Sequence, residues 1–168
     1  MEMAHQKNEH AANKHAAKGH NKHYQKLLIM AVLSFISMYI LMYAMVDRVA
    51  NVFPNINQFY MAGLMAMPML IIEVLLMSAM YMNKKFNVLI IAVSTVALIG
   101  FFLFIRYQTG VSDRQFMRGM IPHHAAAILM AEKASLKDPE VKELARQIIE
   151  SQRVEIAQMK AMLEAMKK

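Results

Sequence analysis

Cysteine is absent from the sequence, and this excludes several classes of metal and redox site. Thiolate zinc sites, cysteine-ligated iron–sulfur clusters and disulfide frameworks all require it. A soft metal ion would have to be bound by thioether sulfur instead, and the chain has 19 methionines among its 168 residues. The absence narrows a soft-metal site to ligands such as methionine, histidine and carboxylate.

Recognisable catalytic motifs are absent as well. The sequence has no nucleophile elbow, no phosphate-binding loop and no His-Glu-x-x-His zinc motif. A ferritin-like di-iron oxidase needs Glu-x-x-His pairs on inward helix faces, and the segment after residue 106 has none. We therefore expect a protein that is not an enzyme.

Charged residues are missing from three long runs of the chain. Residues 27–46 and 86–105 carry no formal charge, and residues 59–82 carry only Glu73. Each run is long enough to cross a hydrocarbon core of about 30 Å as a helix. A charged leader of residues 1–26 precedes the first run and no small-residue cleavage site follows it, which favours an uncleaved signal anchor. The sequence predicts a membrane domain of three transmembrane helices over residues 27–106.

Lysine and arginine residues set the expected orientation, because they are retained on the cytoplasmic side of a membrane. Five lysines precede the first run, and Lys84 and Lys85 separate the second run from the third. Between the first two runs the only basic residue is Arg48, beside Asp47. We expect the inner membrane of a bacterium, with a cytoplasmic N-terminus and a periplasmic C-terminal domain. The same lysines explain most of the formal charge of +7, so no nucleic-acid partner is expected.

The leader carries histidines at a loose five-residue spacing. Side chains five residues apart scatter around a helix, so the spacing does not place them on one face. We expect a flexible cytoplasmic tail that either binds borderline metal ions weakly or is merely solvated. Its possible weak ligands are His5, His10, His15, His20 and His23.

The segment 107–168 has the signals of two helices joined by a short turn. Ser112 and Gln115 form a capping-box pattern for a helix running to about Leu136, and Asp138 with Pro139 opens a second helix that continues to near Lys167. The fold class is therefore all-α, with three transmembrane helices followed by a helical hairpin. Because about 55 residues bury too little for a large core, we expect the hairpin to pack on a second copy or on the spans.

Soft and borderline metal ligands gather on the facing sides of this hairpin. A turn around residues 137 and 138 would bring His123 and His124 level with Gln152, and Met120 level with Glu155. Thioethers with imidazole favour Cu(I), and imidazole with carboxylate also binds Cu(II). The alternative is that the methionines only fill a core. The candidate ligands are Met117, Met120, His123, His124, Met130, Gln152, Glu155 and Met159.

The same residues carry a resemblance to a known family. The stretches DRQFMRGMIPHHAAAILMAEKA at 113–134 and LARQIIESQRVEIAQM at 144–159 resemble the domain-of-unknown-function family 305. The resemblance implies a ferritin-like helical domain related to periplasmic copper-resistance proteins of the CopM type. It implicates Asp113 together with the eight candidate ligands. Secreted members are soluble and often carry two hairpins, so a single hairpin behind three spans would need dimerisation to complete a four-helix bundle.

A second set of methionines follows the middle span. Met65, Met69, Glu73 and Met77 form a drifting stripe along residues 59–82, and an ionisable residue inside a membrane is costly enough to suggest a functional role. The stripe would be a copper or proton relay. The alternative is a protonated or hydrogen-bonded Glu73 at a helix interface, with methionines that only pack.

These observations predict a membrane-anchored copper-binding protein of metal resistance or homeostasis that acts in sequestration or as a metallochaperone. The expected cofactor is a copper ion, with Cu(I) favoured over Cu(II) or Ag(I). The expected partners are the bilayer, further copies of the chain and other copper-efflux components. The alternatives are a transport component that moves Cu(I) or Ag(I) along the transmembrane methionines, and a structural adaptor without metal.

Overall fold

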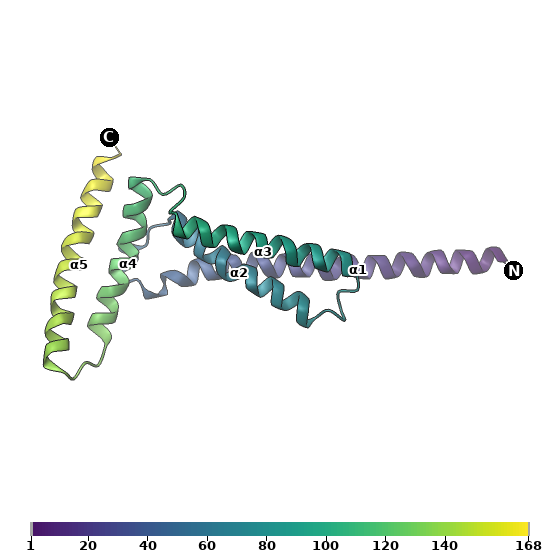
Figure 1. The fold of residues 1–168 in the computed structure, drawn as a ribbon, viewed down its shortest axis with the longest axis horizontal. Helices are drawn as coiled ribbons and strands as arrows, with labels where there is room; N and C mark the ends of the chain where they lie inside the picture. Colours follow the sequence, from purple (N-terminus) through teal and green to yellow (C-terminus); the bar gives the residue numbers. More distant parts are fainter. Residues whose placement is uncertain (1, 168) are drawn as a thin grey trace. The chain divides into compact units, whose positions relative to one another are not determined.

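The structure is a computed structural model that describes the backbone of residues 2–167 and the side chains of residues 22–167. It is all-helical, and residues 2–167 contain no strand. This confirms the expected fold class. The helices, drawn in Figure 1, are α1 (Glu2–Leu41), α2 (Ile56–Leu76), α3 (Lys84–Arg106), α4 (Asp113–Lys133) and α5 (Pro139–Ala165), with short 3-10 helices at Met42–Met45 and Val49–Asn51.

Three helical segments are long and apolar enough to cross a membrane. They are Lys22–Met45, Ile56–Leu76 and Lys84–Arg106, and they correspond to the three expected spans. Large apolar side chains such as Leu41, Leu76 and Val96 are more than two-thirds exposed on them. Such exposure is unfavourable in water and normal where lipid is the solvent, so the segments have the character of membrane helices.

The second span is shorter than expected, because α2 ends at Leu76 and not near residue 82. The Asn83 side chain accepts a hydrogen bond of 3.1 Å from the Phe86 amide at the start of α3. The Asn87 side-chain amide donates to the Tyr81 carbonyl at 2.6 Å. These bonds hold residues 81–83 in a non-helical connection, and Met77 therefore lies in a turn just beyond α2.

The backbone of the leader is helical, because α1 begins at Glu2 and includes residues 2–26. Four alanines between residues 11 and 17 favour a helix, since alanine has the highest helix propensity. The side chains of His5, His10, His15 and His20 lie outside the described residues. His23 is described, and it is half-buried.

The chain divides into two compact units, formed by residues 1–37 with 63–101 and by residues 38–62 with 102–168. In the first unit Leu27, Val74 and Tyr81 form a small apolar cluster. The Tyr24 hydroxyl donates to the Asn87 side-chain oxygen at 2.7 Å beside it. A Cβ atom on Gly63 would lie 2.5 Å from the Phe101 ring, so glycine is required for this close approach.

The second unit contains the α4–α5 hairpin, whose antiparallel helices lie side by side in Figure 1. Both expected N-caps are present. The Ser112 side chain accepts from the Gln115 amide, and the Asp138 side chain accepts from the Glu140 and Val141 amides. The buried core of the hairpin consists of Met117, Ile121, Ala125, Ile128, Ile156 and Leu163.

One side of this hairpin is covered by the connection between the first two spans. Val46 and Phe53 pack against the hairpin core. The Lys160 ammonium donates to the Asn51 side-chain oxygen at 2.6 Å, and the Ile56 amide donates to the Gln115 side chain at 3.1 Å. The additional packing expected for a small hairpin therefore comes partly from residues 46–56.

Candidate metal centre

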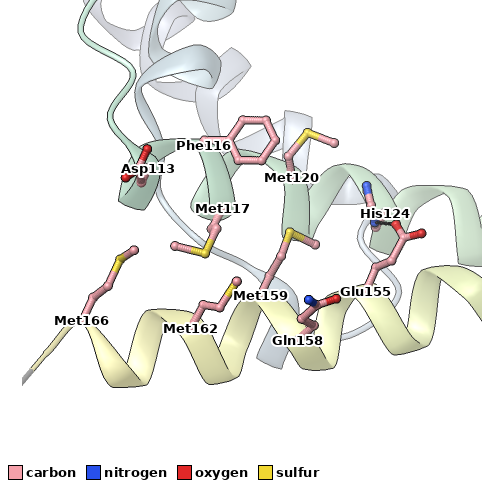
Figure 2. Close-up of a pocket in the computed structure, with 10 residues that line it drawn as sticks. All are labelled: Asp113, Phe116, Met117, Met120, His124, Glu155, Gln158, Met159, Met162 and Met166. Carbon is pink, nitrogen blue, oxygen red and sulfur yellow. Dashed lines mark ion pairs between the residues drawn. The ribbon is translucent and has the colours of Figure 1, made fainter.

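A groove with a volume of about 500 Å³ runs along the seam between α4 and α5. Spacings of three and four residues place its side chains on one face of each helix. Figure 2 shows the lining residues, which are Asp113, Phe116, Met117, Met120 and His124 from α4 and Glu155, Gln158, Met159, Met162 and Met166 from α5. The groove therefore combines one imidazole, two carboxylates and five thioethers.

His124 is the polar side chain that this arrangement buries, with 9% of the residue exposed. Its Nδ1 lies 3.0 Å from a Glu155 carboxylate oxygen, a distance suited to an ion pair. The same Nδ1 has no hydrogen-bond partner in the structure, so the close approach lacks hydrogen-bond geometry. A hydrogen bond depends steeply on direction as well as distance, so the two groups attract by charge without sharing a proton.

Burial lowers the pKa of His124 below its ordinary value of 6.5, while the nearby Glu155 carboxylate opposes this shift. The neighbouring His123 lowers the pKa further. The imidazole is therefore neutral at pH 7. Neutral imidazole with a free nitrogen lone pair is the form that binds a metal ion.

The thioethers surround this histidine unevenly. Figure 2 shows the side chains of Met117, Met159 and Met162 in the space between the helices, whereas that of Met120 is directed away from α5. Met117 is only 5% exposed and belongs to the apolar core. Met162 and Met166 are close to half exposed. Met117 thus contributes to packing, and the more exposed methionines are accessible to an incoming ion.

Three expected ligands do not line the groove. His123 and Met130 are exposed, and Gln152 is half-buried outside the groove. Adjacent residues of a helix point about 100° apart, so His123 diverges from His124. Their ring centroids are 6.2 Å apart.

The helices also meet in a different register from the one expected. His124 faces Glu155 and not Gln152. Helical side chains lean toward the N-terminus of their own helix, so in an antiparallel pair those of α4 lean away from the turn and those of α5 lean toward it. A side chain of α4 therefore meets a residue of α5 that is further from the turn than an equal count of residues on both helices predicts. This explains why His124 faces Glu155 and not Gln152.

Phe116 and Gln158 line the groove although the sequence did not single them out. Each lies four residues before a methionine on the same helix face, Met120 and Met162 respectively. This four-residue spacing was the sequence signal that could have predicted both residues as part of the groove. Met162 and Met166, which were not candidate ligands, extend the groove further toward the end of α5 than the candidate ligands indicated.

Histidine and carboxylate ligands alone do not form a metal site here. Among the described side chains, no three His, Cys, Asp or Glu residues gather closely enough to hold a metal ion. A site at His124 would have to recruit thioether sulfur, the ligand type that favours Cu(I) or Ag(I) over Zn(II).

The transmembrane stripe is less continuous than expected. Met65 is 47% exposed, Met69 and Glu73 are half-buried on α2, and Met77 lies beyond the end of the helix. Met77 directly follows the last residue of α2, and its backbone amide still donates to the Glu73 carbonyl at 2.9 Å.

Comparisons with known proteins place the hairpin in a family. The family described as "Domain of unknown function (DUF305)" matches residues 106–168. The "Uncharacterized protein L153" of Acanthamoeba polyphaga mimivirus is 34% identical over 144 residues, which cover 84% of this chain and 93% of that protein. This alignment is more than twice as long as the matched domain, so the similarity extends into the membrane part. No solved structure matches the chain.

Proposed function

We propose a function on the premise that this chain belongs to the family of the mimivirus protein and has a DUF305 domain at residues 106–168. In this proposal the chain is a membrane-anchored copper-binding protein of metal resistance or homeostasis, acting in sequestration or as a metallochaperone. The domain would bind the ion in the groove between α4 and α5. We propose no catalytic role.

The buried, neutral His124 carries this proposal. Its Nδ1 has no hydrogen bond although the residue is nine-tenths buried. An unsatisfied buried polar group costs about 1–3 kcal/mol, a cost that coordination to a metal ion would offset. In the proposed site His124 provides the nitrogen, Met159 and Met117 or Met120 provide sulfur, and Glu155 orients the ring or binds Cu(II).

We also propose that a second copy completes a four-helix bundle over the groove. On the groove side, α4 has Phe116, Met120, His123, Ala127 and Met130 at alternating spacings of four and three residues. A similar stripe on α5 includes Leu144, Ile148, Glu155, Gln158 and Met162. Such spacing is typical of helix-bundle seams. Phe116, Leu144 and Met130 are each more than half exposed, whereas Val46 and Phe53 cover the opposite side of the hairpin.

The location that we propose is the bacterial inner membrane, with the hairpin on the periplasmic side. The surplus of lysines before the first span and between the second and third supports a cytoplasmic N-terminus. Three membrane crossings would put the first connection and the hairpin on the same side of the membrane. The packing of Val46 and Phe53 on the hairpin supports this arrangement. Other copper-efflux components would receive or deliver the ion there.

Competition titration of the full chain in detergent tests the proposal. We expect Cu(I) to bind more tightly than Zn(II), because most groove ligands are thioethers. The full chain is needed, since Val46 and Phe53 complete the hairpin core. Tighter zinc binding, or binding of neither ion, would contradict the soft-metal site, and the latter result would favour the structural adaptor.

The transport alternative rests on Met65, Met69 and Glu73 of α2. Uptake of Cu(I) or Ag(I) into sealed vesicles that contain the purified chain distinguishes it from sequestration. Uptake above that of empty vesicles would favour transport.

A further inference from the structure

Three basic side chains gather in a second groove, and the proposed copper site does not use them. This groove lies between the first connection and the hairpin, shares no lining residue with the methionine groove, and has a volume of about 330 Å³. Arg48, Arg153 and Lys160 line it, together with Asp47, Asn51 and four apolar residues. Arg48 lies three residues beyond the first span on the expected outer side of the membrane, where the positive-inside rule disfavours basic residues.

A buried polar network holds two of these cations in place. Asn51 is 5% exposed, accepts from the Lys160 ammonium at 2.6 Å, and donates to an Asp47 carboxylate oxygen at 2.6 Å. The other Asp47 oxygen lies 3.2 Å from the Arg48 Nε. The Asp47 side chain is only 7% exposed, so Arg48 and Lys160 are joined through two fixed, buried groups.

Positive charge remains after these contacts. Arg153 pairs with Glu132 at 2.6 Å, so three cations face two carboxylates even when Glu132 is included. Each cation also has hydrogen-bond donors left, because arginine has five and lysine has three. The Arg48 and Arg153 side chains are 66% and 54% exposed, so these donors are accessible from solvent.

We propose that this groove binds a phosphate group, presented by the headgroup of an anionic membrane lipid. Guanidinium groups match phosphate oxygens in geometry and charge. Asp47 follows the end of the first span by two residues, which puts the groove within reach of the headgroup layer. The exposed Ala50 and Ala157 of the lining add a small apolar surface beside these cations. The inference does not depend on the copper site.

Binding of three probes to the full chain in detergent tests the proposal. The probes are phosphatidylglycerol, phosphatidylcholine and inorganic phosphate, measured by native mass spectrometry or by thermal shift. We expect phosphatidylglycerol to bind most tightly, because the choline cation of phosphatidylcholine offsets the attraction of its phosphate. Equal binding of the two lipids would overturn the recognition of an anionic headgroup, and equal binding of inorganic phosphate would overturn the lipid source.

Variants locate the site. Arg48→Gln removes one charge-assisted contact and should weaken phosphatidylglycerol binding on the order of tenfold. Arg146→Gln is the matched control, since Arg146 is exposed and pairs only with Glu143 and Glu150, away from the groove. An equal loss in the control, or no loss in Arg48→Gln, would contradict the site.

Lys160 needs a conservative comparison because its ammonium also lies 5.9 Å from the Phe53 ring centroid. We expect Lys160→Arg to retain most lipid binding and Lys160→Gln to lose it. An unchanged far-UV circular dichroism spectrum and melting temperature would show that each variant is folded. Loss of lipid binding in folded Lys160→Arg, or its retention in Lys160→Gln, would argue against a charge-based site.

Discussion

Replacing His124 with leucine tests whether this residue is a metal ligand or only a packed histidine of the core. The substitution removes the buried Nδ1 that lacks a hydrogen bond and fills similar space with apolar atoms. If His124 is present to bind a metal ion, the metal-free protein should tolerate or benefit from the change. If His124 is a packing residue, the change should be neutral or harmful and should leave metal binding intact.

The structure sets the size of the expected effect. Removing an unsatisfied buried polar group recovers about 1–3 kcal/mol. The attraction to Glu155 is lost, but this carboxylate is 47% exposed, and solvent screening limits such a pair to about 1 kcal/mol. The metal-free unit should therefore be stabilised by about 1 kcal/mol, which raises the melting temperature of a unit of this size by roughly 4–8 °C.

Thermal unfolding of the full chain in detergent, with and without Cu(I), is the assay. An ion at one hundred times its dissociation constant stabilises a protein by about 2.7 kcal/mol, so the wild-type melting temperature should rise clearly. His124→Leu should abolish that rise. Met130→Leu is the control, because Met130 is 54% exposed and does not line the groove, and it should respond to copper like the wild type.

Three outcomes would refute this reasoning. A lower melting temperature of metal-free His124→Leu would show that the imidazole stabilises the fold. A copper-induced rise that survives in His124→Leu would show that the ion binds elsewhere. Equal losses in His124→Leu and Met130→Leu would point to a diffuse methionine surface and not to a discrete site.

Three further predictions concern pH, the membrane and orientation. Because burial lowers the pKa of His124 in the folded state below 6.5, protonation of this residue does not affect the free energy of unfolding above pH 6.5 and decreases it as the pH falls toward the folded-state pKa. Copper affinity should fall in the same direction, and titrations on both sides of pH 6.5 would show it, whereas a constant affinity would exclude His124. Glu73→Gln should leave copper binding and cellular copper tolerance unchanged; lower tolerance with intact binding would favour transport. An exported reporter fused after Lys168 should be active and one fused at Lys84 inactive, and the reverse pattern would place the hairpin in the cytoplasm.

The sequence predicted the membrane helices and the hairpin well because their signals are local. Charge-free runs identified the spans, and Ser112 and Asp138 located the beginnings of α4 and α5. The end of α2 was missed, because it depends on hydrogen bonds that Asn83 and Asn87 make in the following connection. Those contacts had no periodic signal.

The site was predicted in part for a related reason. Helical periodicity placed Met117, Met120, His124, Glu155 and Met159 on facing surfaces, and all of them line the groove. Periodicity placed His123 and Met130 on the flank of that surface, and both were included among the candidate ligands although they are exposed. The packing of Val46 and Phe53 on the hairpin core could not be predicted from local sequence patterns, because it joins segments more than 60 residues apart.

That long-range packing has a consequence for biosynthesis. Phe53 leaves the ribosome about a hundred residues before Leu163, its partner in the same cluster. Because chains are synthesised at about 5–20 residues per second, the first connection is without its partners in α4 and α5 for on the order of ten seconds. Two more spans must also be inserted before α4 and α5 arrive. The final core of the hairpin therefore forms only after the last part of the chain is made, and a chain truncated before α5 leaves Val46 and Phe53 without it.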